Sequence, residues 1–216
     1  MINPIKLRLS SLRALWGHVT SDLRAVCIKE EHQDVIVVFF CDELSEELED
    51  SAQVTTTEII SDIPEGENHY LPMIETLFVC EAYPKPMALF EHLVYLRYEE
   101  GCDRYRELVQ KESFSIVNLP NLRLSGQRAL LGRVTPNLRR IAIVNKDNNV
   151  RFYFYYDGEI ADLERRLAHD ALREVRSDFS LATPPTFDLL LVRTDFPERI
   201  FLPDEEGCWL YVRYEK

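Results

Sequence analysis

Residues 7–24 of the chain read LRLSSLRALWGHVTSDLR, and residues 122–139 read LRLSGQRALLGRVTPNLR. Twelve of these eighteen positions are identical at a constant offset of 115 residues, and no gap is needed. The ends repeat as well, because VYLRYE at residues 94–99 returns as LYVRYE at residues 210–215. The period is too long for a solenoid repeat, so we interpret the chain as two tandem copies of one small domain.

This duplication predicts the domain boundaries in the chain of 216 residues. We expect a first copy over residues 1–100, a linker over residues 101–118 and a second copy over residues 119–216. A helix at about residues 103–111 is expected within the linker. Copies of about 100 residues have the usual size of an independent domain.

Apolar periodicity predicts the same six elements in each copy, in the order α-β-β-α-β-β. In the first copy the helices are expected at residues 10–19 and 45–63, and the strands at residues 23–28, 35–41, 74–83 and 92–98. In the second copy the helices are expected at residues 125–134 and 159–179, and the strands at residues 138–144, 150–156, 187–193 and 208–214. Short polar links favour hairpins, so we predict an α+β fold with antiparallel sheets and the helices on one face.

Acidic residues are concentrated in one part of the first copy. Residues 30–84 contain fifteen Asp or Glu and neither Lys nor Arg, whereas the equivalent residues 146–199 contain eleven acids and eight bases. The fold does not require this field, because the second copy forms without it. A surface of negative charge attracts a basic partner and repels nucleic acid. The plainer explanation of this charge is that extra carboxylates keep the protein soluble.

If a partner binds this acidic part, the carboxylates around the second predicted helix are the best candidates to contact it. The expected partner-binding residues are Asp42, Glu43, Glu46, Glu47, Glu49, Glu65 and Glu67. The partner would then be a basic protein.

Several charged or polar residues recur at equivalent positions of the two copies. The recurring pairs are Arg13 with Arg128, Thr20 with Thr135, Arg24 with Arg139, Asp42 with Asp157, Asp62 with Asp178, and Arg97 with Arg213. Residues kept twice in one fold are most simply structural. We expect Asp42 and Asp157 to cap the helices that follow them, and Asp62 and Asp178 to pair with an arginine such as Arg13 or Arg97.

Catalytic and cofactor motifs are missing from the sequence. It has no Gly-rich phosphate loop, no paired metal-ligand spacing and no histidine that recurs between the copies, so we expect neither catalysis nor a cofactor. The five cysteines are odd in number and lack CxxC spacing, which favours buried thiols in a reducing cytoplasm. No apolar run is long enough for a membrane span.

The segment ALLGRVTPNLR at residues 129–139 and the strand RFYFYYDGEI at residues 151–160 resemble short bacterial proteins of about one such unit. These proteins are similar to immunity proteins of polymorphic and contact-dependent toxin systems. The resemblance implies a non-catalytic inhibitor that binds a toxin, for example a nuclease domain whose phosphate site the candidate carboxylates of the first copy cover. Two alternatives stay open: an adaptor whose copies form a pseudo-dimer within one chain, and a sensor or enzyme with a site between the copies.

Overall fold

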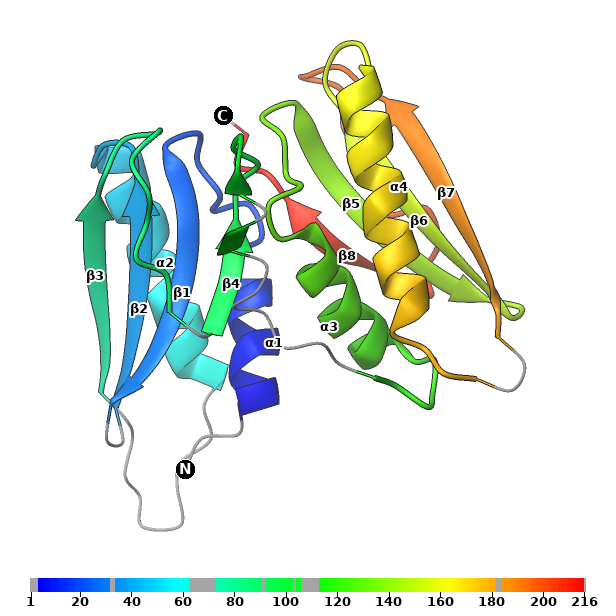
Figure 1. Cartoon of the computed structure of the whole chain (residues 1–216), viewed down its shortest axis with the longest axis horizontal. Coiled ribbons are helices and arrows are strands. Elements are labelled where there is room, and N and C mark those ends of the chain that lie inside the picture. The colour runs from blue at the N-terminus through cyan, green and yellow to red at the C-terminus, as the bar shows by residue number, and fades with distance from the viewer. Residues whose placement is uncertain are drawn as a thin grey trace. The chain divides into compact units, whose positions relative to one another are not determined.

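The computed structural model describes residues 4–31, 34–62, 73–90, 92–102, 104–105, 113–181 and 184–215. The chain divides into two compact units, one formed by Met1–Val109 with Tyr214–Lys216 and the other by Gln110–Arg213. Within the described residues, each unit contains two helices and one four-stranded sheet (Figure 1). The predicted α+β class and the similarity of the two halves are confirmed.

The first unit begins with a helix and continues with a hairpin. Its elements are α1 (Pro4–Ala14), β1 (Leu23–Glu31), β2 (Asp34–Cys41), α2 (Glu46–Asp62), β3 (Ile74–Cys80) and β4 (His92–Leu96). The strand order in the sheet is β3-β2-β1-β4. Strand β1 is antiparallel to both β2 and β4, whereas β2 and β3 are parallel.

The second unit has the same order of elements. They are α3 (Leu119–Leu130), β5 (Leu138–Lys146), β6 (Asn149–Tyr156), α4 (Asp162–Ser177), β7 (Thr186–Arg193) and β8 (Gly207–Val212). The strand order is β7-β6-β5-β8, and β6 and β7 are parallel. Asp147 and Asn148 turn the β5–β6 hairpin with φ angles of 51° and 57°, which suits a tight reversal between twisted strands.

The prediction of antiparallel sheets is therefore wrong, because each sheet contains one parallel pair of strands beside its antiparallel pairs. Helices α2 and α4 are crossover connections that carry the chain from one strand to a parallel neighbour. Parallel neighbours need a long connection of this kind, while antiparallel neighbours can be joined by a two-residue turn. Apolar periodicity locates each strand but does not specify its partner, so the direction of β3 and β7 could not be predicted from it.

Both helices of a unit cover the same face of its sheet, as predicted. Helix α1 contacts α2 and β4, and α2 contacts β3 at the opposite edge. The first helix of each copy starts earlier than expected, at Pro4 and Leu119 rather than at residues 10 and 125. In α3 the Asn118 side chain accepts the Asn121 N–H at 2.9 Å and forms the N-cap. The linker helix expected at residues 103–111 lies largely outside the described residues.

The two central strands of each sheet are largely buried. Strand β2 is buried along most of its length. The helices cover one face, and the chain after β3 covers the other, where the Phe90 ring lies 6.4 Å from that of Phe40. In β6 the side chains of Phe152, Phe154 and Tyr156 alternate along the strand on one face and are each 2% exposed, so they belong to the core.

The two helices of each unit are joined by an equivalent ion pair, which confirms the expected pairing of Asp62 with Arg13. Arg13 Nη2 lies 2.6 Å from Asp62 Oδ2, and Arg128 Nη2 lies 2.5 Å from Asp178 Oδ1. The solvent exposure of the two pairs differs. The Arg13 and Asp62 side chains are 45% and 29% exposed, whereas those of Arg128 and Asp178 are 8% and 0% exposed.

This difference in burial predicts unequal effects of the same substitution. Asp178→Ala leaves the buried Arg128 guanidinium and the Ser125 hydroxyl without the Asp178 carboxylate, so we expect the second unit to lose about 3 kcal/mol of unfolding free energy. Asp62→Ala breaks a partly exposed pair and should cost the first unit about 1 kcal/mol or less.

Each copy contains one tryptophan, which allows the two losses to be measured separately. Trp16 lies in the first copy and Trp209 in the second. Urea denaturation of the full chain would be followed by tryptophan fluorescence, in a Trp16→Phe background for the second unit and a Trp209→Phe background for the first. Equal losses in the two units would contradict the dependence on burial.

Candidate functional site

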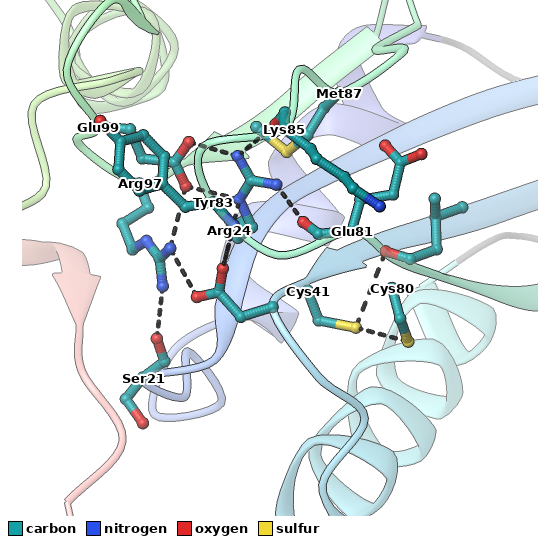
Figure 2. A network of polar contacts seen from close by, with 12 residues as sticks. Ser21, Arg24, Cys41, Cys80, Glu81, Tyr83, Lys85, Met87, Arg97 and Glu99 are labelled. Atoms are coloured by element: carbon teal, nitrogen blue, oxygen red, sulfur yellow. Dashed lines mark hydrogen bonds and ion pairs between the residues drawn. The ribbon is translucent and has the colours of Figure 1, made fainter.

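A fully buried arginine organises the end of the first sheet. Arg24 at the start of β1 donates from Nε to Glu99 Oε1 at 2.7 Å and from Nη2 to Glu99 Oε2 at 2.6 Å. The same guanidinium donates to two carbonyl oxygens of the loop after β3, those of Glu81 and Lys85 (Figure 2). Arg24 thereby fixes this loop to the sheet.

Asp42 and Arg97 complete a connected set of charges, which we call the Arg24 network (Arg24, Asp42, Arg97 and Glu99). The Asp42 carboxylate accepts from Arg97 Nη2 at 2.7 Å and lies 3.7 Å from Arg24 Nε. Arg97 also donates to Glu99 Oε1 at 3.0 Å. Asp42 therefore already has two cationic neighbours inside its own unit.

The surroundings of Asp42 favour its ionised form. Partial burial raises the pKa of its carboxyl, but the hydrogen bond from the Tyr83 N–H and the positive charges of Arg97 and Arg24 outweigh burial. The net result is a pKa below the usual range. Asp42 is thus a fixed negative charge between β2 and α2.

Equivalent contacts occur in the second unit, which supports a structural role for the recurring residues. Arg139 donates to the carbonyls of Thr194 at 2.6 Å and Glu198 at 3.0 Å. Asp157 accepts the Phe196 N–H at 3.1 Å, as Asp42 accepts the Tyr83 N–H at 2.8 Å.

The expected helix-capping role of Asp42 and Asp157 is wrong. At the start of α2 the Ser45 hydroxyl accepts the Leu48 N–H at 3.3 Å, and the N-cap residue of α4 is Ala161. Asp42 and Asp157 instead hold the loops that follow β3 and β7. Sequence adjacency to a helix suggested capping, whereas the actual partners come from distant parts of the chain.

The structure places four of the other candidate acids at or near the start of α2. Glu43, Glu46 and Glu49 are exposed, and Glu47 is half-buried. Glu65 and Glu67 lie outside the described residues. The prediction missed Asp50, which is exposed and follows Glu46 by one helical turn. We call the described exposed acids Glu43, Glu46, Glu49 and Asp50 the acidic surface.

Helix stability alone does not account for the charge of α2. Acids in a first turn are favoured by the helix dipole by roughly 0.3–1 kcal/mol each, but like charges one turn apart, such as Glu46 and Asp50, repel by roughly 0.2–0.5 kcal/mol. Helix α2 contains six acids and no base, whereas the equivalent α4 contains four acids and four arginines. The balanced helix forms in the same fold.

Apolar side chains are exposed beside these carboxylates. Leu44, which precedes α2, is 43% exposed, and Val54 within α2 is 44% exposed. An area with charged residues around exposed aliphatic side chains has the composition of a protein-binding surface.

Two kinds of feature are absent from the described residues. Among them, no group of three or more His, Cys, Asp or Glu side chains is arranged to hold a metal ion. None of the helices within the described ranges has the length and apolar character required to cross a bilayer.

Comparison with known proteins identifies a family for both copies. The family described as MafI2 immunity protein matches residues 4–99 and again residues 120–215. No curated protein matches the chain. The two matches confirm the tandem duplication of an immunity-type protein inferred from the repeated segments.

The Arg24 network predicts that Asp42 supports folding. Asp42→Asn removes the charge facing Arg97 while preserving side-chain size, and we expect the first unit to lose about 1 kcal/mol of unfolding free energy at neutral pH. Because the pKa of Asp42 is lowered in the folded protein, its charge stabilises the fold at pH values above 3.8, the ordinary pKa of this carboxyl. This stabilisation is lost as the pH falls through the lower pKa that Asp42 has in the folded protein.

The measurement compares denaturation of wild type, Asp42→Asn and the exposed control Glu43→Gln, at neutral pH and at pH values below 3.8. The difference between wild type and Asp42→Asn should shrink on acidification, and Glu43→Gln should match wild type at neutral pH. Full stability of Asp42→Asn at neutral pH would exclude the structural role.

Proposed function

The chain belongs to the MafI2 immunity protein family, and we propose that it inhibits a toxin by binding it through the acidic surface of the first copy. The proposed partner is a basic protein domain, of the kind that binds nucleic acid. The inhibitor needs no catalytic step and acts in the cytoplasm, where the toxin would otherwise reach its substrate.

The charge difference between the two copies is the observation that supports this assignment. The copies share one fold and one family, yet α2 contains six acids and no base while α4 is balanced. A requirement of the fold would act on both helices equally. A requirement of binding acts only on the copy that meets the partner, and a negative surface accelerates the encounter with a basic one.

The exposed aliphatic residues beside the acidic surface can prolong the complex, which charge alone does not. Surface carboxylates set the rate and orientation of the encounter, whereas apolar side chains that lose water in the complex prolong it. Leu44 and Val54 are available for this purpose.

Occlusion is the proposed mechanism of inhibition. The carboxylates of the acidic surface, together with Glu47 and with Glu65 and Glu67, would occupy positions that substrate phosphates take on the toxin. Asp42, which was grouped with these residues on the basis of sequence, serves in this proposal as a support for the start of the surface, because Arg97 already neutralises it.

Charge neutralisation tests the assignment of binding to the first copy. The test variant replaces Glu43, Glu46 and Glu49 with Gln and Asp50 with Asn. Its control makes the matching changes at four exposed acids of the second copy, Glu159, Asp162, Glu205 and Glu206. Both variants should keep a melting temperature close to wild type, because exposed charges contribute only about 0–1 kcal/mol each.

We expect the test variant to associate about tenfold more slowly at low salt with the basic domain that the wild-type protein captures in a pull-down, and the control variant to associate at nearly the wild-type rate. The difference should decrease in high salt because the charges are then screened. Stopped-flow association and protection of cells that express the toxin domain are the two readouts. Equal slowing by both variants would contradict the assignment.

A further inference from the structure

Two cysteines lie side by side in the first copy. Cys41 ends β2 and Cys80 ends β3, and the parallel register pairs these two residues directly. Their Sγ atoms are 3.2 Å apart (Figure 2). The equivalent partners in the second copy are Tyr156 and Arg193, so the shared fold does not require two thiols at this place.

The geometry is close to that of a disulfide bond. Neighbouring strands lie about 4.7–4.9 Å apart, which falls within the usual range of roughly 4.4–6.8 Å between the Cα atoms of a disulfide. Closing the bond to about 2.0 Å requires the two sulfur atoms to approach by only about 1.2 Å. Side-chain rotation at the ends of the strands can provide this movement.

The two thiols differ in accessibility. Cys80 is exposed, whereas Cys41 is buried. Burial is the main cause and the adjacent Cys80 thiol the second cause that raise the pKa of Cys41 to about 12. An external reagent therefore reaches Cys80 first, and Cys41 can react only with a group already attached there.

We propose that Cys41 and Cys80 form a reversible disulfide by exchange with a small disulfide such as oxidised glutathione. The Cys80 thiolate attacks one sulfur of the reagent and expels a thiolate, which takes up the proton that Cys80 lost, and a mixed disulfide is left on Cys80. Cys41 then loses its proton and attacks the Cys80 sulfur, and the second expelled thiolate takes up that proton. Two protein thiols are oxidised, and one small disulfide is reduced to two thiols.

The position of this bond links it to the Arg24 network. Cys41 precedes Asp42, and Cys80 precedes Glu81, whose carbonyl accepts from Arg24. Oxidation therefore joins covalently two segments that hydrogen bonds hold together in the reduced protein. The formation of this disulfide does not depend on which toxin the protein binds.

The experiment uses the full chain, reduced and then equilibrated in mixtures of reduced and oxidised glutathione. Free thiols are blocked with N-ethylmaleimide, and digested peptides are examined by mass spectrometry. Wild type should yield a linked pair of peptides containing Cys41 and Cys80, with the loss of two hydrogens. The control Cys208→Ser should yield the same pair, and Cys80→Ser should yield none.

A thermal measurement supplies a second readout. Oxidation should raise the melting temperature of the first unit by roughly 5–15 °C in wild type and leave Cys80→Ser unchanged. Because Cys80 is exposed, this variant is expected to fold. Thiols at Cys41 and Cys80 that stay free in every mixture, or a mixed disulfide at Cys80 that never closes onto Cys41, would overturn the proposal.

Discussion

A buried guanidinium cannot lose its charge, and this constraint organises each copy. Leaving such a group unpaired away from water would cost several kcal/mol, so every donor direction requires an acceptor. Arg24 meets this requirement with the Glu99 carboxylate and with carbonyls of the loop after β3. Satisfying one side chain thus joins the start of β1, the segment after β4 and the loop after β3.

Much of the fold could be predicted from the sequence because its signals are local or repeated. The duplication established the equivalence of the copies, and apolar runs located the strands. The parallel pairing of β2 with β3 could not be predicted, since periodicity carries no information about the neighbouring strand. The partner of Arg24 was also out of reach, because Glu99 lies 75 residues away and Arg24 sits in an otherwise apolar segment.

The candidate site was predictable to a different extent. A run of acids without bases is visible in composition, and the structure exposes four of them, Glu43, Glu46, Glu49 and Asp50, at or near the start of α2. Composition cannot separate a carboxylate that is available to a partner from one already paired, and Asp42 is of the second kind because Arg97 faces it. The proximity of Cys41 to Cys80 was hidden for a related reason, since it depends on the parallel register of two strands.

The crossover helix α2 has one side buried in the core and one side exposed to solvent. Its buried residues, among them Leu48, Ala52 and Ile59, contribute to the core, while the exposed carboxylates Glu46, Glu49 and Asp50 contribute little to it. Substitutions on the free side therefore have small effects on stability, and α4 shows that its charge can be rebalanced completely within the same scaffold. A chain built in this way can change the partner it recognises by successive surface substitutions, with the hydrophobic core and the buried arginine left intact.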